Sequence, residues 1–152
     1  MDLGRTDDDT AKPGIRIADT RADVQPEEKY KLLSTFQIDN AHPQLIHIRT
    51  EEFSAVCPGT GLPDIGTLDI EYIPQEKCVE LKALKYYLFA YRDEGIFQEP
   101  VTDLIYGHLL RLLEPRYLRV QMAYNTRGGF DTTVTCEHGS RAALNPTQQN
   151  HI

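Results

Sequence analysis

The sequence predicts an α+β domain in which two helices cover one face of an antiparallel four-stranded sheet. Apolar residues alternate with polar ones twice early in the chain and twice late, which predicts two pairs of strands. Two segments with apolar residues at three- and four-residue spacing lie between these pairs and predict helices. The order strand–strand–helix–helix–strand–strand has no strand–helix–strand alternation, so it favours an α+β sheet over a parallel α/β sheet.

The first pair of strands is predicted at residues 45–50 and 66–73. The alternating apolar residues are Ile46 and Ile48 in the first segment and Leu68, Ile70 and Tyr72 in the second. The Pro- and Gly-rich stretch between Cys57 and Asp64 favours a hairpin-like connection of the two strands.

The two helices are predicted over residues 80–93, with Gly95 as a stop, and from Pro100 to Pro115. The apolar stripe of the first consists of Leu81, Leu84, Leu88 and Tyr91. The inner face of the second consists of Leu104 or Ile105, His108, Leu109, Leu112 and Leu113. The last two strands are predicted at residues 117–126 and 130–136, joined by a turn at residues 127–129.

A chain of 152 residues is long enough for one domain with its own core. We expect this domain at residues 29–140, after a flexible N-terminal arm at residues 1–28 and before a C-terminal tail at residues 141–152. The formal charge of −7, from 16 basic and 23 acidic residues, argues against a nucleic-acid partner, since such surfaces depend on clustered Lys and Arg.

The three cysteines are widely spaced and form no CxxC pair, which favours a reducing compartment over a disulfide framework or a zinc site. No apolar stretch approaches the roughly 18 residues that span a membrane, and the N-terminus lacks an apolar signal core. We therefore expect a cytoplasmic protein without a membrane partner.

Cys57 is the first candidate functional residue, because it ends a strand-like segment and is followed by a turn that can bring Asp64 back toward it. A thiolate beside an acid/base group is suited to covalent catalysis. The alternative is a small buried cysteine before a surface turn.

Charged residues of the helical region are the next candidates. Lys82 and Lys85 share one helix face, which is either a phosphate-binding pair or a solvated surface. Glu99 precedes a helix that begins at Pro100, so it either interacts with the helix dipole or anchors a ligand that presents N–H donors.

Together these motifs resemble the NADPH-dependent 7-cyano-7-deazaguanine reductases of queuosine biosynthesis, in their short single-domain form. The resemblance covers about residues 30–137 and rests on four stretches in the same order. These are Cys57-Pro58…Gly61…Pro63-Asp64, Glu80-Leu81-Lys82-Ala83-Leu84-Lys85-Tyr86-Tyr87, Phe97-Gln98-Glu99 and Arg127-Gly128-Gly129. It implies a tunnelling fold whose subunits associate through their sheets into barrel rings, a homo-oligomer of stacked rings with sites between subunits.

The resemblance also implies the reaction. Cys57 adds to the nitrile carbon to give a thioimide, Asp64 handles the proton, and two NADPH reduce the adduct to 7-aminomethyl-7-deazaguanine. Glu99, with Gln98, matches the residues that hold the deazapurine. The remaining matches are Val79, Glu80 and Leu81 for the base pocket, and Lys82, Lys85 and Arg127 for the cofactor phosphates.

Three places depart from the family pattern. Gln98 stands where His is common, which puts proton transfer there in doubt, and Leu81 replaces a frequent Ser, which leaves only backbone hydrogen bonds. Asn125-Thr126 precedes Arg-Gly-Gly where Thr-Pro is usual, which leaves Arg127 in place. The histidines show no metal-ligand spacing, so no catalytic metal is expected. The alternatives are a tunnelling-fold enzyme that acts on a pterin and a non-catalytic purine- or pterin-binding ring.

Overall fold

One antiparallel four-stranded sheet organises the part of the chain that the computed structural model describes, residues 24–144. Its strand order is β2-β3-β5-β6, and a smaller sheet pairs β1 with β4. The elements in chain order are η2 (Pro26–Leu32), β1 (Thr35–Gln37), β2 (Ile46–Val56), β3 (Pro63–Ile73), β4 (Lys77–Val79), α1 (Leu81–Phe89), α2 (Gln98–Leu113), β5 (Tyr117–Tyr124), β6 (Thr133–Gly139) and η3 (Arg141–Leu144). The predicted α+β class and the predicted order of the six main elements are confirmed.

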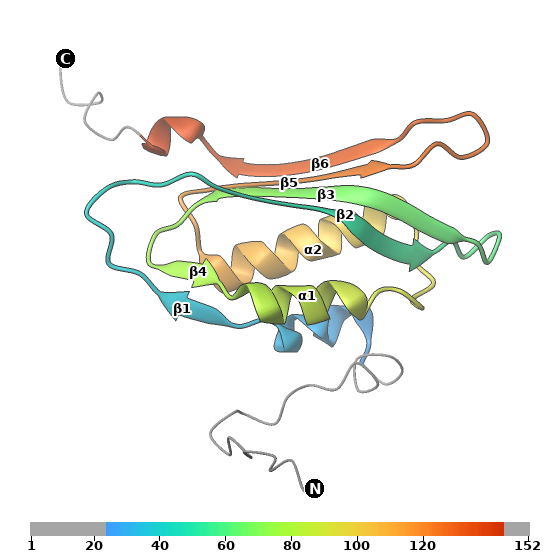
Figure 1. The fold of residues 1–152 in the computed structure, drawn as a ribbon, viewed down its shortest axis with the longest axis horizontal. Coiled ribbons are helices and arrows are strands. Elements are labelled where there is room, and N and C mark those ends of the chain that lie inside the picture. Colours follow the sequence, from blue (N-terminus) through green and yellow to red (C-terminus); the bar gives the residue numbers. More distant parts are fainter. Residues whose placement is uncertain (1–23, 145–152) are drawn as a thin grey trace, which may run out of the picture.

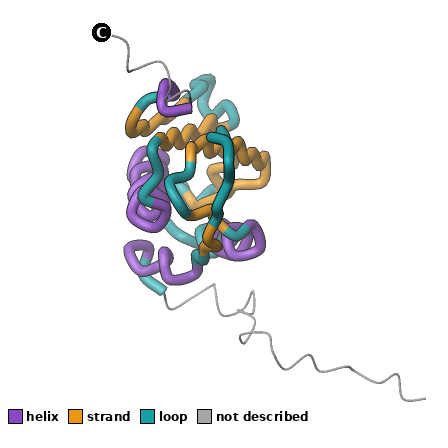
Figure 2. The backbone as a smooth tube through the Cα atoms, turned by 90° about the vertical axis from the view of Figure 1, so that its left-hand side faces the viewer, coloured by secondary structure: helices purple, strands orange, loops and turns teal. Residues whose placement is uncertain are grey.

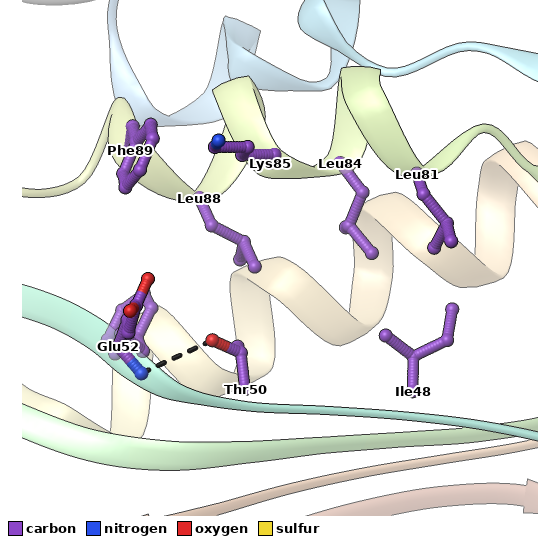
Figure 3. A pocket seen from close by; sticks show the side chains of 9 residues that line it. Ile48, Thr50, Glu52, Leu81, Leu84, Lys85, Leu88 and Phe89 are labelled. Carbon is purple, nitrogen blue, oxygen red and sulfur yellow. Dashed lines mark hydrogen bonds between the residues drawn. The ribbon is translucent and has the colours of Figure 1, made fainter.

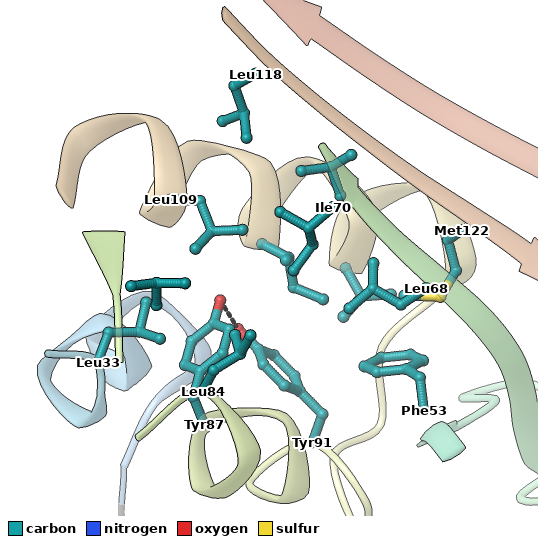
Figure 4. Packing of buried hydrophobic residues seen from close by; sticks show 14 of the residues in the cluster. Leu33, Phe53, Leu68, Ile70, Leu84, Tyr87, Tyr91, Leu109, Leu118 and Met122 are labelled. Carbon is teal, nitrogen blue, oxygen red and sulfur yellow. Dashed lines mark hydrogen bonds between the residues drawn. The ribbon is translucent and has the colours of Figure 1, made fainter. Parts of the chain in front are cut away.

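Both helices cover the same face of the large sheet, with α2 directly under it and α1 farther below (Figure 1). In the view turned by 90°, most of the helical segments lie below the main strands (Figure 2). The core fills the space between the layers and includes Leu68 and Ile70 of β3, Tyr87 of α1 and Leu109 of α2 (Figure 4). Burying a side chain of this size contributes roughly 1.5–3 kcal/mol, so the apolar stripes seen in the sequence hold the layers together.

A chain of hydroxyl and imidazole groups crosses this core. Tyr91 donates its hydroxyl proton to the Tyr87 oxygen over 2.9 Å, and that hydroxyl lies 2.8 Å from Nδ1 of His108. His108 is buried as predicted, and burial lowers the pKa of its imidazole. Because each polar group has a partner, the network carries no unpaired buried atom.

The bounds of all six main elements differ from the prediction. Strand β2 extends to Val56 and β3 begins at Pro63, so both are longer than expected, and β5 ends at Tyr124. Helix α1 ends at Phe89 and a turn follows it, and α2 begins at Gln98, two residues before the expected start at Pro100. Strand β6 begins at Thr133 because Arg127 and Phe130 close a turn with two backbone hydrogen bonds of 3.0 and 2.9 Å. Residues 130–132 are therefore excluded from the strand.

The short sheet of β1 and β4 was not predicted, because three-residue strands are too short to show a period. Thr35 lies opposite Val79, and the Glu80 amide donates to the Ser34 carbonyl over 2.9 Å. This pairing fixes the point at which α1 begins.

The predicted N-terminal arm overlaps the structured domain at its end. Residues 1–23 lie outside the described part, as do residues 145–152 of the predicted tail, whereas residues 26–28 belong to η2. The next residue, Lys29, is 1% exposed and pairs with Glu94 over 3.3 Å. At the other end, Arg141 of η3 forms an ion pair with Glu71 of β3.

Candidate active site

A β-bulge in β2 determines which way Cys57 faces. The pairing of β2 with β3 shifts between Thr50 and Phe53, so inward-facing residues change from even to odd positions. Ile48 faces the helices before the bulge, and Phe53 and Ala55, each 1% exposed, face them after it. Because side chains alternate along a strand, an unbulged strand would turn Cys57 to the opposite face.

The turn after Cys57 wraps around its sulfur. The Cys57 amide donates to the Leu62 carbonyl over 2.9 Å, and the Gly61 amide donates to the Cys57 carbonyl over 2.8 Å. Gly61 has a φ of 69°, which a residue with a side chain adopts only with strain. A Cβ placed on Gly59 would lie 3.9 Å from Cys57 Sγ, so the sulfur lies over this turn.

Hydrogen bonds from this turn favour the thiolate. The Thr60 hydroxyl, followed by the backbone amides of Thr60 and Gly59, lowers the pKa of the Cys57 thiol below its ordinary value, and Arg127 adds a smaller contribution. Donors that stabilise a thiolate make the sulfur a better nucleophile near neutral pH. The interpretation of Cys57 as an inert buried thiol is therefore disfavoured.

Asp64 lies opposite Ala55 in the sheet and is 3% exposed. Its carboxylate accepts a hydrogen bond from Nη1 of Arg127, which forms an ion pair with it. Arg127 reaches this position from the turn between β5 and β6, where Gly128 and Gly129 have φ values of 57° and 82°. The Arg-Gly-Gly motif thus places a cation beside the carboxylate.

The start of α2 lies beside the same strand ends. The connector before it pairs with β2, through a 2.9 Å bond from the Val56 amide to the Glu94 carbonyl and a 3.1 Å bond from the Ile96 amide to the Val56 carbonyl. The Gln98 carbonyl accepts from the hydroxyls of Thr102, over 2.8 Å, and Tyr124, over 3.2 Å. These bonds hold the first turn of α2 against β2 and β5.

These elements enclose one open pocket of about 460 Å³. The predicted site residues that line it are Cys57, Asp64, Gln98, Glu99 and Arg127, and the aromatic residues Phe97 and Phe130 lie at its rim. Both aromatic side chains are more than half exposed. A thiol, two carboxylates and a guanidinium therefore meet in one pocket of a single chain.

The other predicted site residues lie at the start of α1, on a different surface. Val79 is buried and its amide donates to the Tyr72 hydroxyl over 3.2 Å. The Glu80 carboxylate caps α1 by accepting from the amides of Lys82 and Ala83, each over 2.8 Å, and these bonds lower its pKa. Its side chain therefore has a structural role that the sequence did not reveal.

Leu81 and Lys85 line an apolar groove of about 230 Å³ between α1 and β2, together with Ile48, Leu84 and Leu88 (Figure 3). The side chains of Lys82 and Lys85 are exposed, and within the described part of the chain neither forms a salt bridge. Lys85 lines this groove, whereas Lys82, three residues earlier on α1, does not line it. Arg127, which the motif groups with them, lies instead in the Cys57 pocket.

Sequence reasoning did not identify Thr132, which lines the pocket, or Thr60, which lies beside it in the turn after Cys57. Thr60 contacts Cys57 and also accepts from Arg127 Nη2 over 2.9 Å. Its place in the turn motif was the available signal. Among residues 24–144, no group of three or more His, Cys, Asp or Glu side chains is arranged to hold a metal ion, and no helix there is long and apolar enough to cross a membrane.

Comparisons with known proteins show which family the chain resembles. Residues 63–143 match the model of the QueF-like protein family. The NADPH-dependent 7-cyano-7-deazaguanine reductase of Chlorobium phaeobacteroides is 50% identical over 113 residues, which cover 72% of this chain and 94% of that protein. The protein of the same name from Alkalilimnicola ehrlichii is 45% identical over 111 residues, covering 71% and 84%.

Among solved structures, the apo form of an archaeosine synthase QueF-Like matches with a TM-score of 0.59 at 25% identity, over 64% of this chain and 96% of that one. This likeness supports the α+β fold with antiparallel strands. On the family model and the curated relatives together, the chain belongs to the QueF-like family, which includes the NADPH-dependent 7-cyano-7-deazaguanine reductases.

Proposed function

We propose that this chain reduces 7-cyano-7-deazaguanine to 7-aminomethyl-7-deazaguanine at the expense of two NADPH, as a step in queuosine biosynthesis. The observation that carries the proposal is the pocket in which Cys57, Asp64 and Glu99 meet. The relatives' shared name supplies the substrate and the cofactor.

Cys57 is the nucleophile in this proposal. Its sulfur adds to the nitrile carbon, one C≡N π pair moves to nitrogen, and nitrogen takes a proton, which gives a thioimide. Protein and substrate combine without loss of any atom. A thiol whose pKa is lowered by the surrounding turn presents the thiolate that this addition needs.

Asp64 is the proton carrier. Its carboxylate lines the same pocket as the sulfur, so it can accept the thiol proton and return it to the nitrile nitrogen. A buried carboxylate in contact with a guanidinium keeps a fixed position, which favours repeated transfer between the same two atoms.

Glu99 holds the deazapurine. An exposed carboxylate in the first turn of α2 can accept hydrogen bonds from a ring N–H and an exocyclic amine. Gln98 lies beside it and contributes an amide, which donates or accepts a hydrogen bond but does not titrate in the working range.

Lys82 and Lys85 would hold the NADPH phosphates, and when bound the cofactor supplies hydride to the carbon attached to Cys57. Val79, Glu80 and Leu81 lie in the same region and would contribute backbone groups and apolar surface to the base pocket. In one chain this surface is separate from the pocket of Cys57. A site that needs both is therefore built from two copies of the chain.

The assembly that meets this need is a homo-oligomer of barrel rings. Within the described residues, β2 and β6 are the edge strands of the large sheet, and the outer edge of β2 is bridged only at Val56, so most of both edges is available to pair between subunits. Exposed Phe97 and Phe130 at the rim of the pocket would be buried by a neighbour. Closing the pocket would also exclude water, which would otherwise hydrolyse the imine that forms between the two reductions.

The proposal is tested by the stoichiometry and the product of the reaction. We expect two NADPH to be oxidised for each nitrile consumed, with the aminomethyl compound as the product by mass spectrometry. An acid or amide product would show nitrile hydrolysis, and tight binding without turnover would show a non-catalytic binding protein. Either outcome would overturn the proposal.

A further inference from the structure

The guanidinium of Arg127 links two parts of the site that are far apart in sequence. Its Nη1 donates to Asp64 Oδ1, and its Nη2 donates to Thr60 Oγ1 over 2.9 Å. Arginine presents such donors in one rigid plane, which lysine cannot reproduce. Arg127 therefore fixes the distance between the carboxylate of β3 and the hydroxyl of the turn after Cys57.

The Thr60 oxygen already accepts two hydrogen bonds, so its own proton can be donated only in the remaining direction. A threonine oxygen accepts at two lone pairs and donates one proton. Arg127 Nη2 occupies one lone pair, and the Leu62 amide, at 3.3 Å, occupies the other. The remaining O–H is free to donate toward the sulfur of Cys57, and the Thr60 side chain is the largest cause of the lowered pKa of that thiol.

We infer that Thr60 and Arg127 are positioning residues that hold the Cys57 sulfur and the Asp64 carboxylate in one hydrogen-bonded unit. This inference rests on the proposed reaction and deepens it. The proton that moves between Cys57 and Asp64 leaves one negative charge, on either the sulfur or the carboxylate. Arg127 pairs with Asp64 and lines the same pocket as Cys57, so its positive charge offsets the negative charge at either place.

The assignment separates Arg127 from Lys82 and Lys85, with which its motif is grouped. The two lysines lie on α1, whereas the guanidinium of Arg127 is engaged inside the pocket of Cys57. A residue that acts on the thiol changes the reactivity of Cys57 before any ligand binds. A residue that only binds phosphate does not.

The test is the rate at which iodoacetamide alkylates Cys57 in the full-length, ligand-free protein between about pH 5 and pH 9, followed by peptide mass spectrometry. Only the thiolate reacts, so the rate falls as pH falls through the thiol pKa. In Thr60→Val and in Arg127→Gln, we expect the pH at which the alkylation rate falls to rise by about one unit. Alkylation at pH 6 should then be about tenfold slower than in the wild type.

Matched controls isolate the contacts. Thr50 accepts from the Glu52 amide two residues on, as Thr60 does from Leu62, and Arg141 bridges a carboxylate and a hydroxyl, as Arg127 does. Thr50→Val and Arg141→Gln should leave the Cys57 profile unchanged. Cys136 is an internal reference in every variant, because the pKa of its thiol is raised by burial.

The other charged groups that line the pocket with Cys57 are Asp64, Glu99 and Arg127 itself, so Glu99→Gln is profiled as well to separate its charge from that of Arg127. An unchanged Cys57 profile in either Thr60→Val or Arg127→Gln, with the Cys136 rate at its wild-type value, overturns the assignment of that residue. If either variant does not fold, Thr60→Ser and Arg127→Lys replace it. We expect Ser to keep the profile and Lys to shift it partway.

The alkylation profile tests the inference and the reductase activity tests the proposed function, so either can be contradicted without the other. A protein that does not reduce the nitrile but shows the shifted profiles retains the thiolate assignment and loses the proposed function. A variant of Arg127 that only raises the KM for NADPH, with an unchanged profile, returns Arg127 to the cofactor and contradicts the inference.

Discussion

The Cys57 pocket and the start of α1 both carry stretches that resemble the family, yet only the first set comes from separate stretches that one chain gathers into a single pocket. Cys57, Asp64, Glu99 and Arg127 come from four separate stretches and meet in one pocket. The residues from Val79 to Lys85 form a contiguous stretch and line a different groove. A family motif thus identifies which residues belong to a site, but the fold of one chain decides which of them it can bring together.

The difference arises from the elements that carry the two halves of the proposed site, the Cys57 pocket as the first half and the start of α1 as the second. The pocket lies where the ends of β2, β3 and β5 meet the start of α2, and backbone hydrogen bonds hold these ends together. The start of α1 is fixed by its pairing with β1 and by the Glu80 cap. The first half is therefore preorganised within one chain, and under the proposed function the second half would join the site through a neighbouring copy.

The largest effect should come from removing the proton carrier in the preorganised half. Asp64→Asn keeps the shape of the side chain but neither accepts nor returns a proton, so kcat should fall by about a thousandfold. Single-turnover kinetics measure this loss directly. A loss of less than about threefold would show that Asp64 is not the acid/base group.

The second largest effect should come from the other half. The double variant Lys82→Glu/Lys85→Glu reverses two exposed charges, so kcat/KM for NADPH should fall by about a hundredfold through loss of phosphate contacts. Circular dichroism should stay at the wild-type signal. The matched control is Arg111→Glu on the exposed side of α2, which should leave the KM for NADPH unchanged.

A smaller effect should follow from weakening the substrate anchor. Glu99→Gln loses charge-assisted acceptance from the deazapurine, which is worth about 1.5–3 kcal/mol, so kcat/KM should fall by about 10- to 100-fold. The KM for NADPH should stay at its wild-type value. If instead only the KM for NADPH rises, Glu99 contacts the cofactor and the assignment is wrong.

Co-expression of two inactive variants tests whether the two halves of the proposed site come from different chains. If each site takes its two halves from different chains, mixed oligomers of Cys57→Ala with Lys82→Glu/Lys85→Glu should regain about a quarter of the wild-type activity. The control pair, Cys57→Ala with Asp64→Asn, changes one half only and should regain none. Equal recovery in both pairs, or none in either, would contradict a site shared between chains.

The sequence was informative where a pattern is local. The alternation in β2 and β3, the apolar stripes of the helices and the Arg-Gly-Gly turn all predicted elements that the structure contains. The bulge between Thr50 and Phe53 was not predictable, because it depends on pairing with β3 and leaves no period of its own. Without it, the facing of Cys57 could not be derived.

Two side-chain contacts were not anticipated, one local and one distant. The Glu80 carboxylate caps α1 through the amides two and three residues later. Thr60 was missed because its importance depends on a bond to Arg127, 67 residues away. Pairings of this kind are set by the tertiary fold, and a single sequence does not show them.

The most direct test of the central claim is the intact mass of the protein after mixing with 7-cyano-7-deazaguanine in the absence of NADPH. Because the addition loses no atom, the account predicts a mass increase of one substrate molecule, and no increase in Cys57→Ala. The Cys136→Ala variant should still form the adduct. Folded wild-type protein that binds the nitrile without any adduct would contradict covalent capture by Cys57.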